Sequence, residues 1–377
     1  MNTLRVVVTI IQLTLLMVTT AFAELPAPAP AGTARPAADI TKIASSLGYI
    51  TSILPLPGSS DTLLVARGDG YVSRIEGGKI QRRYVLDIED LISSKIPNAL
   101  FGMAVSRHFP VTRHLYLGFV DRQGDTVVAR ITVPEDYRCH PESLVVIIKV
   151  VQDAQHVRTG ALSFGSDDLL YIATGDGGQD IPTAGGENPA KDLQSLLGKV
   201  LRIDVSKSEY SIPSDNPFRN SSSALPEIYA YGVRDPIHLI TTPELMLVDK
   251  GASKADSIIP FTAASNLGWP LREGEVCVRV GCEASEVKEG STDNVISYTR
   301  ALGNCLGGAA MRSLGGEPSL VYGDCKSGAI FATPIPVRGS KLNPTFLKTI
   351  GEPISSLSTA VSGAVLIGTQ TGNLYSF

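Results

Sequence analysis

A short apolar strand, a turn rich in Gly and Asp, and a second β-rich strand recur along this chain. Six such units begin at Leu63, Leu115, Leu170, Leu245, Leu320 and Val365. Apolar strands joined by Gly/Asp turns are typical of β-hairpins, and a blade of a β-propeller takes roughly 40–50 residues. The repeat therefore predicts an all-β chain folded as a six-bladed β-propeller, with a pair of β-sandwich domains as the competing fold.

Helical periodicity is nearly absent from the same region. Only residues 40–47 and 190–197 have a pattern that favours a short helix. A propeller hides most strand edges by radial repetition and needs no helices to cover its sheets. The scarcity of helical pattern therefore agrees with the predicted fold.

The first 23 residues have the pattern of a secretory signal peptide. Arg5 precedes an apolar run at residues 6–18, and Ala21-Phe22-Ala23 forms a small-x-small cleavage site. The competing interpretation is a retained membrane anchor, but the run is short for a span of about 20 residues. We therefore expect export to the periplasm or secretion.

The rest of the chain divides into a linker and one large domain. Residues 24–39 are rich in Pro and Ala, which predicts a disordered or extended linker, and residues 40–377 are expected to form the propeller. The formal net charge is −4 and no basic run is present, which argues against nucleic acid and anionic membranes as partners. No second apolar run is long enough to span a bilayer, so we expect a soluble mature chain.

Five cysteines in an exported chain suggest two disulfides and one remaining thiol. Cys277 and Cys282 are close enough in sequence for a small staple, and Cys305 and Cys325 flank a Gly-rich loop and could pair. Cys139 is then the odd thiol. Reduced, buried thiols are the alternative for both pairs.

Several catalytic patterns are missing from the sequence. GxSxG, HExxH, the P-loop and a strand-to-helix GxGxxG are all absent, and CxxC does not occur. With only five histidines, a His-rich metal centre is not supported either. Any chemistry must come from a different arrangement of residues.

Seven segments carry a family resemblance: LFGMAVSRHFP (100–110), YIATGDGG (171–178), NPAKDLQSLLGKVLRIDV (188–205), IPSDNPF (212–218), PEIYAYGVRDP (226–236), SNLGWPLREG (265–274) and LVYGDCKSGAIF (320–331). In this order they resemble the glucose/sorbosone dehydrogenases, which are soluble quinoproteins with six-bladed propellers that bind pyrroloquinoline quinone (PQQ) and calcium. The resemblance implies oxidation of an aldose at its anomeric carbon. A histidine would take the hydroxyl proton, a hydride would pass to PQQ, and a separate acceptor would take the electrons.

The resemblance assigns the catalytic base to His156, which precedes the strand ALSFG. The family pattern places this histidine five residues before the Leu of the strand. Here Leu162 follows His156 by six residues, and Val157 occupies the five-back position. Either the loop contains one extra residue, or His156 is a loop histidine without a catalytic role.

The resemblance also assigns Arg234, in YGVRDP, to the cofactor. PQQ is a tricarboxylate, so its charge must be paired by cations in a partly dry site. Asp235 stands where the family has Asn and adds a negative charge, and Pro97 replaces a family glutamine. A structural turn built on Arg234 is the alternative interpretation.

Two lysines are the other candidate partners of the PQQ carboxylates. Lys326 is the sole cation in LVYGDCKSGAIF, and Lys250 is an extra cation in the calcium loop. Sugar-oxidising members place arginines, and the broader family a basic residue, at positions that here are Ser327, Ala329 and Ala332. The resemblance is therefore weaker at the cofactor than in the scaffold.

Residues 249–259 align with the family's calcium loop, of the form E/D-x-G-x-x-x-x-D/E-E-I-N. The second acid of its acidic pair is replaced by Ser257 and its Asn by Ile259, which lowers the charge available to a cation. Calcium favours carboxylate and carbonyl oxygens. The resemblance assigns the site to Asp249, Gly251, Ala252 and Asp256, with Gly251 and Ala252 acting through backbone carbonyls.

Two functions remain open at this point. The chain is either an exported PQQ-dependent aldose dehydrogenase or a propeller without catalysis that binds a saccharide, a cell-envelope component or a protein partner. Asp176, in the Gly-rich turn, is interpreted as a calcium ligand or as part of an Asx turn. Other prominent motif residues are expected to be structural: Asn188, Asp192, Gly198, Trp269 and Pro270.

Overall fold

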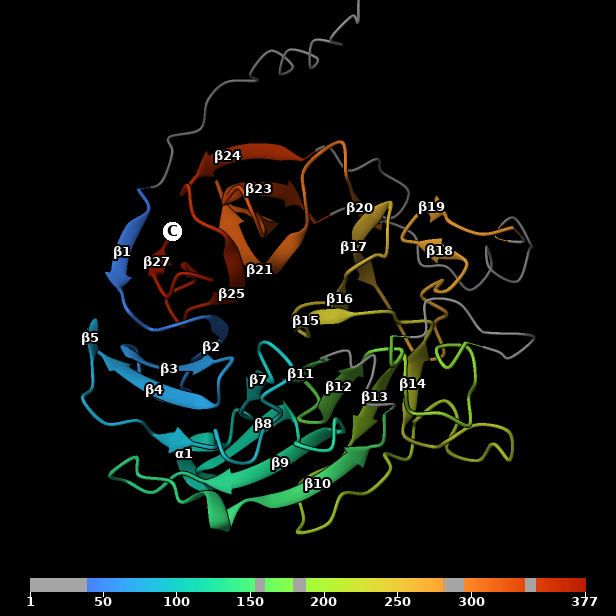
Figure 1. Ribbon diagram of the computed structural model, residues 1–377, viewed down its shortest axis with the longest axis horizontal. Helices are drawn as coiled ribbons and strands as arrows, with labels where there is room; N and C mark the ends of the chain where they lie inside the picture. Colours follow the sequence, from blue (N-terminus) through green and yellow to red (C-terminus); the bar gives the residue numbers. More distant parts are fainter. Residues whose placement is uncertain (1–38, 153–159, 179–187, 281, 283–294, 336–343) are drawn as a thin grey trace, which may run out of the picture. The chain divides into compact units, whose positions relative to one another are not determined.

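Six antiparallel sheets account for almost all regular structure in the described part of this chain (Figure 1). The computed structural model describes residues 39–152, 160–178, 188–280, 282, 295–335 and 344–377. The predicted signal peptide and nearly all of the predicted linker lie outside the described residues. In the part of the chain that is described, no helix is long and apolar enough to cross a bilayer.

Each sheet is one blade with four main strands. In chain order the blades are β2 (Ile50–Pro55), β3 (Thr62–Arg67), β4 (Tyr71–Glu76) and β5 (Lys79–Ile80), with β6 (Leu86–Asp87) also on β4; β7 (Leu100–Ala104), β8 (His114–Val120), β9 (Thr126–Thr132) and β10 (Val145–Val150); β11 (Gly160–Phe164), β12 (Leu170–Thr174), β13 (Lys199–Ile203) and β14 (Ile228–Tyr231); β15 (Pro236–Ile240), β16 (Met246–Asp249), β17 (Ala255–Pro260) and β20 (Ile296–Thr299); β21 (Leu306–Leu314), β22 (Glu317–Asp324), β23 (Ala329–Pro334) and β24 (Thr345–Thr349); and β25 (Ile354–Thr359), β26 (Val365–Thr369), β27 (Leu374–Ser376) and β1 (Thr41–Ala44).

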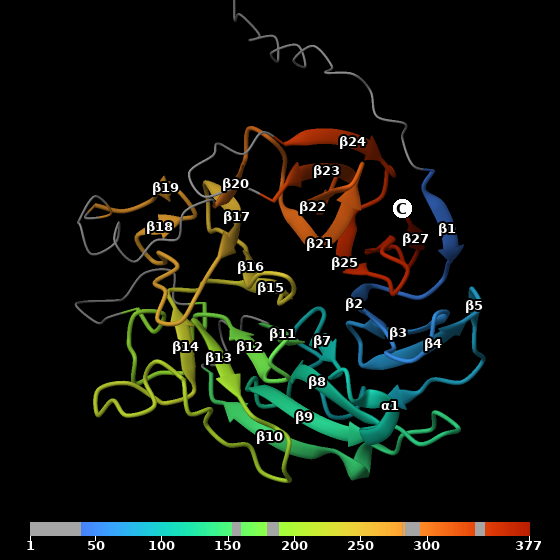
Figure 2. The ribbon, with the colours of Figure 1, turned by 180° about the vertical axis from the view of Figure 1, so that it is seen from behind.

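The ring of blades is closed by contacts between the first strands and by pairing of the two ends of the chain. The first strands β2, β7, β11, β15, β21 and β25 contact one another in turn, and β25 returns to β2. The sixth blade takes its outermost strand from the other end of the chain, since β1 pairs with β27 through Thr41 and Ser376 (Figures 1 and 2). The six-bladed propeller is confirmed, and each predicted repeat unit forms the second and third strands of one blade.

Hydroxyl side chains tie neighbouring first strands together. Thr51 Oγ1 donates to the Leu100 carbonyl at 2.7 Å, and Ser355 Oγ donates to the Ile50 carbonyl at 2.6 Å. First strands of adjacent blades share no backbone ladder, so these bonds replace it. The inner ring is therefore held by packing and by side-chain-to-backbone bonds.

Both predicted helices are wrong. Residues 41–44 form β1 because pairing with β27 overrides their local pattern. Residues 190–197 form turns, since the Lys199 ammonium takes the carbonyls of Pro189, Ala190 and Leu197 at 2.6, 3.2 and 2.6 Å. Those carbonyls are then directed to a side chain rather than to a helical ladder.

The Gly-rich segment at residues 303–316, which overlaps the loop expected between Cys305 and Cys325, is not a loop. Most of it is β21, the first strand of the fifth blade. A Cβ on Gly307 would lie 2.2 Å from the Ile354 carbonyl oxygen, so the close approach of β21 and β25 requires small residues. The glycines here serve packing between blades.

Both predicted disulfides are confirmed. Cys277 pairs with Cys282 and Cys305 with Cys325, with Cα–Cα distances of 5.8 and 5.3 Å. Cys139 is a free thiol. The first pair staples the hairpin of β18 (Arg272–Glu273) and β19 (Val276–Cys277) to residue 282, and the second joins two loops of the fifth blade.

Candidate functional site

The predicted site residues lie at one end of the fourth and fifth blades. Strands alternate in direction within a blade, so the loop after each second strand and the loop leading into the next blade share one end. Arg234 precedes β15, Asp249 ends β16 and residues 250–252 follow it, and Lys326 lies between β22 and β23. The predicted base, His156, lies outside the described residues.

Arg234 and Asp249 form the inner part of this site. Asp249 Oδ2 accepts the backbone N–H of Arg234 at 3.0 Å, and Oδ1 accepts that of Asp235 at 2.7 Å. Burial raises the pKa of Asp249 to about 7, although these two amide bonds oppose the shift. Asp249 therefore fastens the end of β16 to the turn before β15.

The Arg234 side chain is 6% exposed and turned toward its own blade. Its guanidinium donates to the Lys250 carbonyl at 3.1 Å and lies 5.2 Å from the Trp269 ring centroid. This cation–π contact and the carbonyl bond fix the guanidinium in one orientation. The structural interpretation of Arg234 has direct support in these contacts.

Asp176 joins the Gly-rich turn of the third blade to the same region. Its Oδ1 accepts the Gly178 N–H at 2.9 Å, and its Oδ2 accepts Trp269 Nε1–H at 2.7 Å. The Asp176 backbone N–H donates to the Arg234 carbonyl at 2.9 Å. Of the two interpretations of Asp176, the structure thus contains the Asx turn, and Trp269 links two blades as expected.

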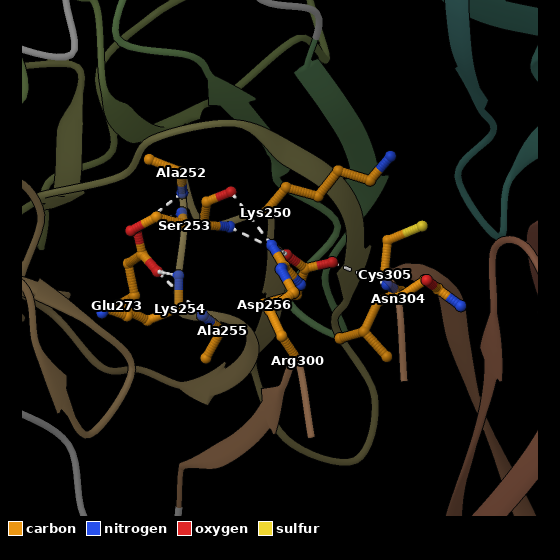
Figure 3. Close-up of polar contacts among 12 residues, drawn as sticks. Lys250, Ala252, Ser253, Lys254, Ala255, Asp256, Glu273, Arg300, Asn304 and Cys305 are labelled. Atoms are coloured by element: carbon orange, nitrogen blue, oxygen red, sulfur yellow. Dashed lines mark hydrogen bonds and ion pairs between the residues drawn. The ribbon is translucent and has the colours of Figure 1, made fainter. Parts of the chain in front are cut away.

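Asp256 ties three segments together (Figure 3). It is 1% exposed. Its Oδ1 accepts the Gly251 N–H at 3.1 Å and Arg300 Nη2–H at 2.8 Å, and its Oδ2 accepts the Leu306 N–H at 2.7 Å. Both oxygens of this predicted calcium ligand are engaged by nitrogen donors.

Glu273 fills the inside of the adjacent loop (Figure 3). It is 4% exposed. Its Oε1 accepts the N–H groups of Ala252 at 2.7 Å and Ser253 at 3.0 Å, and its Oε2 accepts those of Lys254 at 2.6 Å and Ala255 at 2.9 Å. Successive backbone N–H groups turned toward one anion form a nest, and here the anion belongs to the protein.

Asp324 performs a similar task beneath Lys326. It accepts the N–H groups of Asn304 at 2.8 Å, Lys326 at 2.9 Å and Ser327 at 2.7 Å, and the hydroxyl of Tyr298 at 2.9 Å. Burial opposes ionisation, but the amide bonds outweigh it and lower the pKa of Asp324 to about 2. The Cys305–Cys325 disulfide joins the same two loops, so the backbone around Lys326 is held firmly.

Two ammonium groups on this face carry unpaired charge. Lys250 is partly exposed and Lys326 is exposed, and neither has a carboxylate partner among the described residues. Figure 3 shows Lys250 extending away from Glu273, on the same side of the loop as Asn304 and Cys305. These two ammonium groups fit an anionic ligand such as a polycarboxylate.

The predicted calcium ligands fit a divalent cation poorly. The carboxylate oxygens of Asp249 and Asp256 all accept hydrogen bonds from N–H groups. Calcium takes six to eight oxygen ligands at about 2.3–2.6 Å. In the described parts of the chain, no three side chains of the His, Cys, Asp and Glu types are grouped to hold a metal.

Sequence reasoning missed the residues that shape these loops. Glu273 stands inside the quoted SNLGWPLREG segment, so its position near the site was visible, although its role was not. Asp324 likewise stands inside the quoted LVYGDCKSGAIF segment, whereas Arg300 has no local pattern that marks it. Their partners lie on other strands or loops, which only the tertiary fold brings near.

Comparison with known proteins agrees with this architecture. Residues 51–371 match the family described as Glucose / Sorbosone dehydrogenase. The chain belongs to the glucose/sorbosone dehydrogenase family. The family resemblance read from the seven segments is therefore confirmed.

Individual related proteins match shorter stretches of this chain. HIPL2 protein of Arabidopsis thaliana is 37% identical over 132 residues, covering 30% of this chain and 18% of that protein. Hedgehog-interacting protein of Homo sapiens is 28% identical over 217 residues, covering 52% of this chain and 31% of that protein. The matched segments span less than a third of the length of these two relatives.

A solved structure matches nearly the whole fold. The PQQ-bound form of aldose sugar dehydrogenase from Streptomyces coelicolor superimposes with a TM-score of 0.71 at 18% identity, covering 91% of this chain and 99% of that one. At this identity the likeness establishes the propeller fold.

Proposed function

We propose that this family member is an exported sugar dehydrogenase that binds PQQ at the loops of its fourth and fifth blades and oxidises an aldose at the anomeric carbon. The observation that carries the proposal is the pair of unpaired ammonium groups, Lys250 and Lys326, on the same face as Arg234. Their charge suits a tricarboxylate. Family membership supplies the sugar substrate class.

The residues of this chain have three tasks in the proposal. Lys250 and Lys326 pair with carboxylates of the ligand, and Arg234 holds the loop that presents Lys250. His156, as a neutral imidazole, takes the proton of the anomeric hydroxyl. When bound, PQQ supplies a two-electron acceptor for the hydride from the same carbon, and a separate electron acceptor completes the cycle.

Titration of the purified chain with PQQ tests the ligand, and dye reduction with a panel of aldoses tests the reaction. Lys250→Gln and Lys326→Gln should each weaken PQQ binding about tenfold, since a charge-assisted pair contributes roughly 1.4 kcal/mol or more. Lys348→Gln, on the exposed edge strand β24, is the matched control and should bind as wild type. His156→Ala should bind PQQ and lose dye reduction, and absence of binding at micromolar PQQ would refute the proposal.

A second candidate function is ligand binding without catalysis. It is favoured by Ser327 and Ala332, which stand where sugar-oxidising members have arginines. Ser327 Oγ donates to Asp324 at 2.8 Å and Ala332 is 4% exposed, so neither adds charge to the face. The name of the human relative records a protein partner, which supports this class. PQQ or saccharide binding with no dye reduction by any aldose would select it.

A further inference from the structure

The loop that resembles a calcium site already contains a cation of its own. Arg300 follows β20, and its backbone N–H donates to the Lys254 carbonyl at 3.1 Å. Its guanidinium forms an ion pair with Asp256 at 2.8 Å, and Nη2 also faces the Gly251 carbonyl at 3.5 Å. One guanidinium thus touches two groups of the predicted calcium-ligand set.

The carboxylate oxygens of that set are engaged by other donors as well. Asp249 accepts two backbone N–H groups, and Asp256 also accepts those of Gly251 and Leu306. The neighbouring Lys250 carbonyl accepts the Arg234 guanidinium. A calcium ion would have to displace guanidinium groups and leave buried N–H groups unpaired, which costs about 1–3 kcal/mol for each group.

The loop also needs no cation to hold its shape. Glu273 accepts four successive N–H groups from residues 252–255, so the curvature of the loop is fixed from inside by an anion. Asp256, at 1% exposure, requires a compensating positive charge, and Arg300 supplies it. Charge balance and backbone satisfaction are both achieved by the chain alone.

We infer that Arg300 takes the place of the divalent cation in the loop 249–256, so that this family member folds and binds its ligand without calcium at that loop. The part concerning the ligand rests on the proposed function, whereas the part concerning the loop stands by itself. Arg300 is thus a positioning residue, which acts through Asp256 and Gly251.

Calcium binding to the full chain tests this inference. After treatment with EDTA, wild-type protein is examined by thermal unfolding and equilibrium dialysis with calcium up to about 10 mM, at least tenfold above the Kd of roughly 10⁻⁴–10⁻³ M of weak extracellular sites. We expect no rise in Tm. If wild-type protein binds calcium and Asp256→Asn does not, the inference is overturned. If both proteins bind calcium equally, the ion lies at another site and the inference is supported.

Removal of the internal cation should create a calcium response. Arg300→Gln removes the positive charge beside Asp256 and the Gly251 carbonyl, so a cation can compensate the buried carboxylate and calcium should raise the Tm of this variant by about 2 °C or more. Lys254→Gln is the matched control, because it removes the same charge from an exposed position in the loop, and it should show no rise. An equal response in both variants would contradict the special role of Arg300. If Arg300→Gln does not fold, Arg300→Lys keeps the cation and should remain insensitive to calcium.

PQQ titration in EDTA separates the two proposals. Binding in EDTA with unchanged affinity supports both of them. Binding that requires calcium, with the calcium lost in Asp256→Asn, overturns the inference and leaves the proposed function standing. No binding under either condition refutes the proposed function, while the dialysis result still decides the role of Arg300.

Discussion

Replacement of Glu273 by Ala is the most informative perturbation of this site. The substitution removes the acceptor of four backbone N–H groups at 2.6–3.0 Å in a side chain that is 4% exposed. Each hydrogen bond to a charged group contributes about 1.5–3 kcal/mol, but water reaching the partly exposed loop would recover part of this. We expect a loss of about 3–5 kcal/mol, the cost of breaking a buried charged network by removing one partner.

Thermal unfolding followed by circular dichroism measures this loss. At about 2 °C per kcal/mol, the lower end of the range for large domains, Tm should fall by roughly 6–10 °C. Glu273→Gln should give an intermediate value, because its amide group retains one acceptor oxygen and turns a donor toward the remaining N–H groups. PQQ binding should weaken in both variants, since Lys250 begins the same loop.

Glu275→Ala provides the control. Glu275 is two residues away and exposed, and the variant makes the same change of charge. Its Tm should stay within about 1 °C of wild type, as is usual for exposed substitutions. Equal effects of the two alanine variants would show that net charge, rather than the four N–H bonds, is responsible, and a wild-type Tm for Glu273→Ala would refute the reasoning.

Three further predictions concern the scaffold. His238 Nδ1 accepts the Ala309 N–H at 3.4 Å, and burial lowers the pKa of His238 to about 4. The neutral imidazole therefore contributes fully to the free energy of unfolding above the ordinary pKa of about 6.5, and roughly 2–3 kcal/mol is lost as pH falls toward 4. His238→Gln should flatten this part of the curve of unfolding free energy against pH, and an unchanged slope would contradict the prediction. Lys199→Met leaves three carbonyls without their donor and should lower the free energy of unfolding by about 2–4 kcal/mol. Proteolysis at residues 188–198 should be faster, whereas wild-type resistance would show that water replaces the ammonium. The double variant Cys305→Ser/Cys325→Ser opens a loop with a sequence separation of 20 and should lose about 3 kcal/mol, and a wild-type Tm would mean that Asp324 alone holds the two loops.

The class of fold was accessible from the sequence because a propeller is a local repeat. Each unit at Leu63, Leu115 and their four counterparts is a hairpin whose strands are adjacent in sequence, so its pattern is visible in one short window. The disulfides were accessible for a related reason, since few pairings of five cysteines place close neighbours together. The segment 190–197 was misread because its carbonyls are taken by Lys199, a tertiary contact that local pattern does not contain.

The chemistry of the site was decided by the tertiary structure. The sequence by itself determined the six blades, the family, and which cations are present at the family's cofactor positions, such as Arg234 and Lys326. It did not determine that Asp249 and Asp256 accept N–H groups instead of facing a metal, because their donors come from other strands and loops. An Asp or Glu in the sequence can bind a cation or accept backbone N–H groups. Which of these roles it takes depends on the donors that the fold places next to it.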